Sequence, residues 1–501
     1  MAESEGSPLA FSTSNLPLKL YINGQYVDSK DGKTPLAVYN PKDGTLVSDQ
    51  VPLAGEKDVE AAVTAAEAAF PAWKKTTANQ RRDILLKLAS LIEQHNKELA
   101  RLARLTLGAP WASFGAFEGV VCSETFKYNA GWTDKFAGES FPQENGYLQI
   151  TRNEPLGVTC GIVPWNGPLA GIALKAAPAL ATGNCFILKP SEKTPFAPLA
   201  LGALIEEAGF PPGVFQILSG DGSTGALLAS HMRIRKVSFT GSIATGRKIQ
   251  EMAAKSNLKR VTLELGGKSP AVVFDDCNLD NAVTWCVNAI TANSGQVCYA
   301  ASRIYVQKGI FDKFAAKYAE AMQARANAVG DPDEPSTLLG PVVDKAQFER
   351  VCGFIERGID GQQGKLLVGG KRVTTGNTGS GYFIEPTVFQ DVDPNAEIYQ
   401  NEIFGPVSIL NSFTLEEEVV QKANATEYGL MAGVFTQDVN KALRVASEFD
   451  SGMVGVNCIS LVHVNTPFGG SKASGVGREC GRAALQAFTE PKTIMINMQY
   501  T

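Results

Sequence analysis

The spacing of apolar residues near the N-terminus predicts two amphipathic helices. Apolar residues recur there every three or four positions, as they do on the buried face of a helix. One face carries Val59, Ala62, Val63, Ala66 and Phe70, and a second face carries Ile84, Leu88, Leu91 and Leu99. Pro71 lies between the two sets, and we expect it to separate the helices. Both helices are interpreted as packing elements.

After Gly157 the pattern changes to short apolar runs that alternate with helical stretches. This alternation predicts β-α repetition and a parallel sheet. The expected strands are 158–163, 185–189, 214–218, 236–239 and 260–264, and the expected helices are 168–181, 195–208, 224–230 and 243–255. A second series follows, with expected strands 271–274, 303–307, 365–368, 432–435 and 453–457 and helices such as 311–327 and 439–449. The predicted fold class is therefore α/β, with a Rossmann-like doubly wound parallel sheet and a second α/β domain.

Two apolar stretches fit neither series. The segments 147–152 and 493–498 read as strands, and strands that no sheet of their own chain accounts for often pair with a partner subunit. We therefore expect a small strand-based oligomerisation region.

Length and charge narrow the class of protein. With 501 residues the chain exceeds the size of a single core, so two or three domains are expected. Lys and Arg number 46 against 51 Asp and Glu, and this balance argues against nucleic acid as a partner. The nine cysteines are scattered and form no C-x-x-C pair, so neither a disulfide framework nor a metal site is expected.

The ends of the chain and its apolar runs suggest a location. Residues 1–8 contain acids and no apolar run, so they do not resemble an export signal. Apolar runs such as 157–163 are too short to span a bilayer. We expect a cytoplasmic protein with no membrane partner.

One cysteine stands in a setting that suits a nucleophile. Cys298 follows Gly295 and Gln296, and Glu264 ends an apolar strand about one helix and one strand earlier. A thiol that is acylated and then freed needs a base nearby, and Glu264 could serve as one. A buried structural cysteine is the alternative interpretation, and structural cysteines are the more common kind.

Several strand ends offer groups that could bind an anion or a ribose. Gly220-Asp-Gly-Ser-Thr-Gly225 matches G-x-G-x-x-G, but the next strand does not end in the acidic residue that this motif requires. Gly241 and Ser242 offer a close turn and a helix start that could bind phosphate or simply cap the helix. Lys189 and Glu192 could bind ribose hydroxyls, and the Asn166 amide could stabilise an oxyanion; exposed strand ends and turns are the alternatives.

In this order the motifs resemble those of a known family. They are Pro164-Trp-Asn166, Leu188-Lys-Pro-Ser-Glu192, Phe239-Thr-Gly-Ser242, Leu263-Glu-Leu-Gly-Gly-Lys-Ser-Pro270, Gly295-Gln-Val-Cys298, Glu402-Ile-Phe-Gly-Pro-Val407 and Pro467-Phe-Gly-Gly-Ser-Lys-Ala-Ser-Gly-Val-Gly-Arg-Glu479. Over nearly its whole length the chain resembles the NAD(P)-dependent aldehyde dehydrogenase superfamily, in its hydrolytic, non-phosphorylating branch. The resemblance implies a dinucleotide-binding domain at 1–136 and 156–262, a catalytic domain at 263–470, and oligomerisation strands at 137–155 and 482–501. A homodimer or homotetramer is implied in the same way.

The resemblance also implies roles for the site residues. Cys298 would attack the aldehyde, Asn166 would stabilise the oxyanion, Glu264 would activate water, and Lys175 and Glu479 would relay its proton. The cofactor would be NAD, with NADP possible, because the Glu192 carboxylate would repel a 2′-phosphate. The implied cofactor-binding residues are Ile162, Val163, Trp165, Lys189, Glu192, Gly222, Phe239, Gly241, Ser242, Gly246, Leu265, Glu402 and Phe404.

The residues expected along the substrate tunnel are Gly167, Ala170, Gly171, Leu174, Ala292, Val297, Tyr299, Val462 and Phe468. Relatives that prefer small aldehydes have aromatic and large aliphatic side chains there, and this chain departs from them at Gly167, Ala170, Gly171, Leu174, Ala292 and Val462. Tyr299, His463 and Phe468 are expected to refill part of the space. Small residues predict a wide tunnel and an aromatic or otherwise bulky aldehyde substrate. A dehydrogenase for small aliphatic aldehydes and a cysteine-dependent esterase are the alternatives. Residues 105–110 also depart from the family pattern, and this affects only local packing or a tunnel rim.

Overall fold

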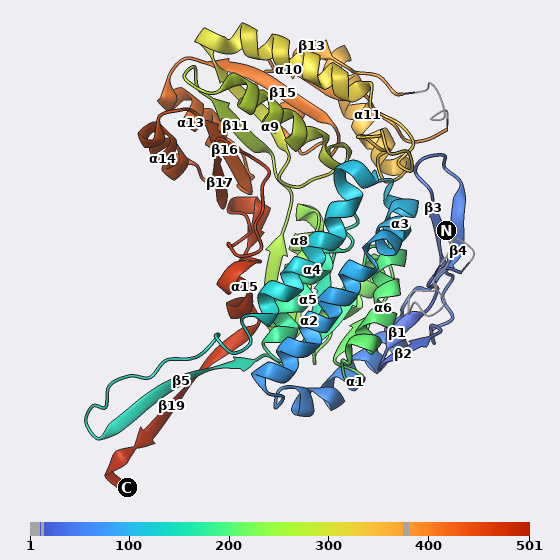
Figure 1. Ribbon diagram of the computed structural model, residues 1–501, viewed down its shortest axis with the longest axis vertical. Helices are drawn as coiled ribbons and strands as arrows, with labels where there is room; N and C mark the ends of the chain where they lie inside the picture. Colours follow the sequence, from blue (N-terminus) through green and yellow to red (C-terminus); the bar gives the residue numbers. More distant parts are fainter. Residues whose placement is uncertain (1–10, 12–14, 374–379, 501) are drawn as a thin grey trace.

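The computed structural model describes residue 11 and residues 15–373 and 380–500. The N-terminal residues 1–8, which bear on export, lie outside the described residues. Figure 1 shows two α/β bodies joined by the chain, with a two-stranded arm standing away from them. None of the helices within the described ranges combines the length and the apolar character needed to span a bilayer.

The first body is built on an eight-stranded sheet with the order β18-β10-β9-β6-β7-β8-β1-β2. The five predicted strands form its centre and are all parallel. The strands are β1 Leu20–Ile22, β2 Gln25–Val27, β6 Val158–Ile162, β7 Cys185–Lys189, β8 Phe215–Ile217, β9 Lys236–Thr240, β10 Arg260–Glu264 and β18 Gly475–Val476. The three outer strands β1, β2 and β18 did not stand out in the sequence. The predicted α/β class with a Rossmann-like doubly wound sheet is confirmed.

The direction of winding reverses beside β6, and this reversal positions the site. The chain runs from β6 through β7 to β8 on one side, then returns to β9 and β10 on the other side. In such sheets ligands bind where the strand order reverses, at the carboxyl ends of the strands. The helices of this body are α1 Glu56–Trp73, α2 Ala78–Gln94, α3 Asn96–Leu107, α4 Ala116–Ala130, α5 Ala170–Ala181, α6 Phe196–Ala208, α7 Gly222–Ser230, α8 Ile243–Lys255 and α15 Gly481–Ala487.

Two details of the N-terminal helices differ from the prediction. Pro71 does not separate them, because it lies inside α1, which continues to Trp73. A proline two residues from the end of a helix costs one backbone hydrogen bond, and α1 retains its buried face. Leu99 belongs to a third helix, α3, because the helical path is interrupted at His95. This residue is the C-cap of α2 and the N-cap of α3.

The second body contains a seven-stranded sheet with the order β13-β14-β15-β12-β11-β16-β17, in which only β13 is antiparallel. Strand β11 is apolar from Ala271 to Val273 because both of its faces are buried. Ala271 and Val273 enter one buried cluster, and Val272 enters the other. The strands are β11 Ser269–Val273, β12 Ala301–Gln307, β13 Lys365–Val368, β14 Thr387–Gln390, β15 Val407–Phe413, β16 Met431–Phe435 and β17 Met453–Val456. The helices are α9 Leu279–Thr291, α10 Phe311–Ala326, α11 Lys345–Asp360, α12 Glu397–Gln400, α13 Glu416–Asn424 and α14 Val439–Glu448.

The expected division between residues 262 and 263 falls inside β10. Strand β10 ends at Glu264 and β11 of the second sheet begins at Ser269, so four residues connect these two strands. Two further pairs of strands lie outside both sheets. They are β3 Leu36–Tyr39 with β4 Leu46–Val51, and β5 Tyr147–Pro155 with β19 Thr489–Asn497. The second pair forms the arm in Figure 1, so the two strands that fitted neither series pair with each other.

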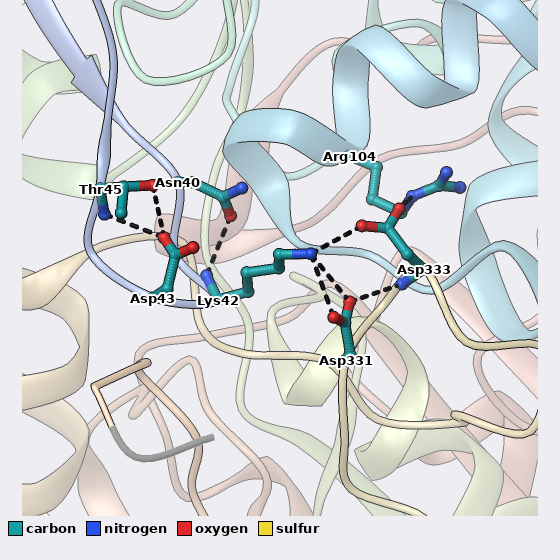
Figure 2. A network of polar contacts seen from close by, with 7 residues as sticks. All are labelled: Asn40, Lys42, Asp43, Thr45, Arg104, Asp331 and Asp333. Carbon is teal, nitrogen blue, oxygen red and sulfur yellow. Dashed lines mark hydrogen bonds and ion pairs between the residues drawn. The ribbon is translucent and has the colours of Figure 1, made fainter. Parts of the chain in front are cut away.

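A polar network joins the two bodies far from the strand ends. Lys42, in the turn between β3 and β4, points toward Asp331 and Asp333 of the second body, with Nζ 3.0 and 2.9 Å from their carboxylates (Figure 2). Arg104 of α3 approaches Asp333 from the other side at 2.7 Å. The nearby Gly108 leaves no room for a side chain, because a Cβ there would lie 2.5 Å from Pro341. The departure at 105–110 therefore concerns packing between the bodies.

Candidate active site

A cavity of about 770 Å³ opens at the reversal point of the first sheet. Its walls are the carboxyl ends of β6, β7 and β9 and one face of α8. Nine of the thirteen residues expected to bind the cofactor line it: Ile162, Val163, Trp165, Lys189, Glu192, Gly222, Phe239, Gly241 and Ser242. The cavity extends from Gly222 of α7 to Trp165. It lies where doubly wound sheets bind dinucleotides.

Glycines and a helix start shape the phosphate end of this cavity. A Cβ on Gly241 would lie 2.5 Å from the Phe239 ring, so the turn after β9 requires glycine. Ser242 caps α8 by accepting a hydrogen bond from the Thr245 amide at 3.3 Å, so the expected cap is present beside the cavity. A Cβ on Gly222 would meet nothing within 4 Å, which leaves the start of α7 open to a ligand. The N-termini of α7 and α8 at this end of the cavity are therefore suited to bind a diphosphate.

The G-x-G-x-x-G segment has a mixed outcome. Gly220 makes a tight turn under Thr224, and Asp221 caps α7 through the Ser223 amide at 2.8 Å. Gly222 and Gly225 line the cavity, but β9 ends in Thr240, without an acidic residue. The segment therefore contributes to the wall without forming the full dinucleotide fingerprint.

Lys189 and Glu192 lie together at the end of β7. The Lys189 ammonium is buried, donates to the Pro190 carbonyl at 3.0 Å and lies 3.8 Å from the Glu192 carboxylate. Burial lowers the pKa of Lys189. The Glu192 side chain is 42% exposed and lines the cavity, so its charge faces whatever occupies that end.

The other four expected cofactor residues lie beyond this cavity wall. Gly246 packs under Leu265, since a Cβ there would lie 2.7 Å from that side chain. The Phe404 ring meets Trp165 edge to face at 5.3 Å. Glu402 accepts a hydrogen bond from the Gly267 amide at 3.0 Å, and burial raises its pKa to about 7. Phe404 thus contacts the cavity wall at Trp165, and Glu402 lies near enough to Cys298 to raise the pKa of the thiol.

Sequence reasoning missed the α8 face of the cavity. The residues Thr245, Lys248, Ile249 and Met252 line it at helical spacing of three and four. That spacing was present in the sequence, but it also describes any amphipathic helix packed on a sheet.

The loop before Cys298 is strained and tightly anchored. Asn293 and Ser294 adopt left-handed backbone angles, with φ of 47° and 55°, and Gly295 follows with φ of 74°. Left-handed angles cost energy in residues other than glycine, so the surroundings must hold them. The buried Gln296 side chain does this: it donates to the Asn293 carbonyl at 2.9 Å and accepts from the Val343 amide at 2.8 Å.

Asn166 is tied to the same loop. Its side-chain amide donates to the Gln296 carbonyl at 2.9 Å, while the Asn293 amide donates to the Asn166 carbonyl at 3.1 Å. An amide nitrogen has two donors, so the second N–H of Asn166 stays available beside Cys298. The structure thus brings Asn166 and the cysteine loop together, as expected.

Glu264 ends β10 beside Cys298 and is buried. Neither of its carboxylate oxygens has a hydrogen-bond partner among the described residues. Burial raises its pKa well above the ordinary value, and the nearby negative charge of Glu479 raises it further. A buried carboxylate with unused acceptor oxygens is suited to take a proton.

Lys175 and Glu479 form a buried ion pair behind Glu264. The Lys175 ammonium also donates to Thr240 at 2.7 Å, and Ser238 donates to the same Glu479 oxygen at 3.1 Å. The other Glu479 oxygen is buried without a partner among the described residues. The expected relay residues therefore lie together.

Burial raises the pKa of the Cys298 thiol. The side chain is partly accessible but deep in the protein, so desolvation raises its pKa well above the ordinary value, and the charges of Glu264 and Glu402 raise it further. A thiol with a raised pKa needs a base to become a nucleophile. The Glu264 carboxylate is close enough to Cys298 to raise the pKa of the thiol and could serve as that base.

A second cavity of about 430 Å³ is lined by Val462 and Phe468, which belong to the same apolar cluster as Cys298. The Tyr299 and Phe468 rings meet edge to face at 5.8 Å, and both pack with Leu174 and Cys298 in one apolar cluster. Ala292 and Val297 belong to the adjoining cluster. Gly171 differs from expectation: a Cβ there would contact Val163 and Pro164, so a side chain would pack against the end of β6.

The fold and the site define a class: an α/β dehydrogenase whose dinucleotide cavity leads to a buried cysteine. The described residues contain no cluster of side chains suited to hold a metal ion. The family model "Aldehyde dehydrogenase family" matches residues 26–494, so the chain belongs to that family. It is an NAD-dependent aldehyde dehydrogenase, and the predicted family and reaction class are confirmed.

Individual relatives agree with this assignment. Retinal dehydrogenase 2 of Homo sapiens is 43% identical over 495 residues, which cover 97% of this chain and 93% of the relative. The solved NAD+ complex of an aldehyde dehydrogenase from Bacillus cereus has 40% identity and a TM-score of 0.92, with 96% of both chains covered. A solved NADP-dependent enzyme of E. coli has 36% identity and a TM-score of 0.92, covering 97% of this chain and 99% of that one. The family thus includes users of both cofactors.

Proposed function

We propose that this enzyme oxidises aromatic or otherwise bulky aldehydes to carboxylic acids with NAD and water. The proposal rests on the small side chains of Gly167, Ala170 and Ala292, at positions that the family resemblance assigns to the substrate tunnel. A wide apolar passage binds a large substrate by burying its surface and leaves a small substrate poorly held. The relative named for retinal, itself a bulky aldehyde, supports the proposal.

In the proposed mechanism Cys298 is the nucleophile. Its proton passes to a base, its sulfur bonds to the aldehyde carbon, and the carbonyl oxygen becomes an oxyanion. The free N–H of Asn166 and the Cys298 backbone N–H stabilise that oxyanion. The nicotinamide supplies the hydride acceptor, and loss of hydride leaves a thioester on Cys298.

Glu264 completes the cycle in this proposal. It takes a proton from water, the hydroxide oxygen bonds to the thioester carbon, and the carbon–sulfur bond breaks to release the acid and the thiolate. The Lys175–Glu479 pair then receives the proton from Glu264. The unused oxygens of Glu264 and Glu479 leave room for such a transfer.

The cavity at the end of β7 supports NAD as the preferred cofactor. Lys189 and Glu192 would bind the adenosine ribose, and the Glu192 carboxylate would repel a 2′-phosphate. Gly241 and Ser242 would hold the diphosphate, and Glu402 and Phe404 would hold the nicotinamide end.

The arm supports an oligomer. Met495 and Ile496 on β19 are exposed to 69% and 37%, so the arm presents apolar surface for a partner copy. We propose a homodimer or homotetramer, which light scattering on the purified protein measures directly.

All nine cysteines are free, and this supports a reducing, cytoplasmic location.

An aldehyde panel tests the proposed function. NADH formation is followed at equal concentrations of acetaldehyde, benzaldehyde and a long-chain aldehyde, and kcat/KM is compared. We expect benzaldehyde or the long-chain aldehyde to exceed acetaldehyde by about tenfold or more. A clear preference for acetaldehyde would refute the bulky substrate but leave the reaction class intact.

A further inference from the structure

One carboxylate beside the proposed substrate passage has no role in the mechanism above. Glu118 lies on α4, which packs against α5, and its side chain reaches the first residues of the passage. The residue is only 4% exposed, so the carboxylate lies deep in the protein. A buried carboxylate is expensive unless its surroundings satisfy it.

The two oxygens of Glu118 have different surroundings. Oε2 accepts hydrogen bonds from the Leu169 and Ala170 amides at 3.0 and 3.3 Å, and so caps the start of α5. Oε1 receives no hydrogen bond from any residue in the described ranges, and it faces Gly167. A Cβ built on Gly167 would lie 3.5 Å from Oε1, and no atom outside the Glu118 carboxylate would lie within 4 Å of it.

Gly167 therefore uncovers the carboxylate. Any larger side chain at this position would stand in van der Waals contact with Oε1 and separate it from the passage. Glycine leaves an acceptor oxygen beside Asn166, the residue proposed to hold the reacting oxygen. An uncovered acceptor oxygen in a substrate passage is a point of recognition.

Burial and hydrogen bonding act on the Glu118 carboxyl group in opposite directions. Burial raises its pKa to about 7, while the hydrogen bonds from the Leu169 and Ala170 amides lower it and so favour the charged acceptor. Tyr299 is near enough for the Glu118 charge to raise the pKa of Tyr299 further, after burial and Cys298. The carboxyl group thus lies near the aromatic side chains that pack with Cys298.

We propose that Glu118 is a specificity-determining residue, and that it favours bulky aldehydes carrying a hydroxyl group, which donates a hydrogen bond to Oε1. The inference rests on the proposed preference for bulky aldehydes. A hydroxyl fits better than an ammonium group, because an ammonium would lose far more hydration on entering an apolar passage. A hydrogen bond to a charged acceptor is worth enough to change kcat/KM by about tenfold.

Matched substrate pairs test this recognition. The full-length enzyme is assayed with NAD and with 3- and 4-hydroxybenzaldehyde, each against its methoxy counterpart, which has similar bulk but no donor. We expect at least one hydroxy isomer to exceed its methoxy counterpart by about tenfold in kcat/KM. The ratio within a pair cancels any general loss of activity in a variant.

Two variants and one control assign the effect. Glu118→Gln keeps an acceptor for the α5 amides but removes the charge, and the ratio is expected to fall by about fivefold. Gly167→Ala covers Oε1 and is expected to lower the same ratio. Glu124→Gln changes a carboxylate on the exposed side of the same helix, where it pairs with Lys127, and should leave the ratio unchanged.

The outcomes separate this inference from the proposed function. NADH formation from benzaldehyde without a hydroxyl preference overturns the role of Glu118 and leaves the proposed function standing. A preference that persists unchanged in Glu118→Gln also overturns it. Failure of every aromatic aldehyde overturns the role of Glu118, and failure of the long-chain aldehyde as well overturns the proposed function.

Discussion

Gly469 lies directly against Glu264: a Cβ on Gly469 would stand 2.6 Å from the Glu264 Oε1 atom. The glycine has φ of 154°, at the edge of the region that other residues rarely adopt. The position of the carboxylate therefore depends on a residue 205 positions later in the chain, beyond the second sheet. A side chain at position 469 would displace the Glu264 carboxylate.

Glu264→Gln should separate the two halves of the reaction. The amide has nearly the same shape but cannot take a proton from water, so the thioester should form and then persist. We expect a burst of NADH close to one per active site, followed by turnover slowed by about 100-fold or more. Rapid-mixing absorbance measures both phases. Steady-state turnover equal to the unaltered enzyme would remove Glu264 from the proposed role.

The pH dependence should report the raised pKa of Glu264. The base works only when deprotonated, so activity should rise with pH through a pKa well above that of an ordinary carboxyl group. In Glu479→Gln the negative charge that raises this pKa is gone, and the midpoint of the profile should move to lower pH. Turnover under saturating substrate is the quantity to measure. A midpoint that moves to higher pH would contradict this electrostatic account.

Glu192→Gln should increase the use of NADP. Removing the carboxylate removes the repulsion of a 2′-phosphate while keeping similar volume, so the ratio of kcat/KM for NADP over NAD should rise by about tenfold. Glu251→Gln is the matched control, because Glu251 lines the same cavity but pairs with Lys255. An equal rise in both variants would mean that only the overall charge of the cavity matters.

Lys42→Met should loosen the contact between the two bodies. It leaves Asp331 and Asp333 near each other without their shared cation, and the cost is expected to be about 1 kcal/mol of stability. Denaturant unfolding measures the loss, which should shrink in 1 M salt because the charges are then screened. Lys19→Met is the control, since its pair with Asp28 is exposed and should contribute almost nothing. A loss that does not depend on salt would point to packing instead of charge.

The sequence predicted the centre of each sheet better than its edges. Apolar runs such as 185–189 and 271–274 were found because strands buried on both faces are continuously apolar. Strands β14 and β15 were missed, although both are internal to the second sheet. β14 has four residues, and β15 contains Asn411 and Ser412, so neither gives a clear period. The two-residue β18 is defined by its pairing with β10 and has no signal of its own.

Site residues were predictable where a motif repeats a family pattern, and less so where folding alone brings groups together. Cys298, Glu264 and Asn166 stood out in motifs. In the structure Asn166 is hydrogen-bonded to the loop that carries Cys298, and Glu264 lies near the thiol. Glu118 did not stand out, because an acidic residue in a helix normally faces water. Only the packing of α4 on α5 and the absence of a side chain at Gly167 give it a position at the passage.

The loop that carries Cys298 is anchored by neutral amides. Gln296, Asn293 and Asn166 hold it through four side-chain hydrogen bonds, and none of these groups titrates or attracts salt ions. Acidity and ionic strength therefore change the charges of Glu264, Glu402 and Glu479 around a nucleophile that keeps its place. In this enzyme the geometry of the sulfur and the supply of protons are separate properties, and each can change during evolution without disturbing the other.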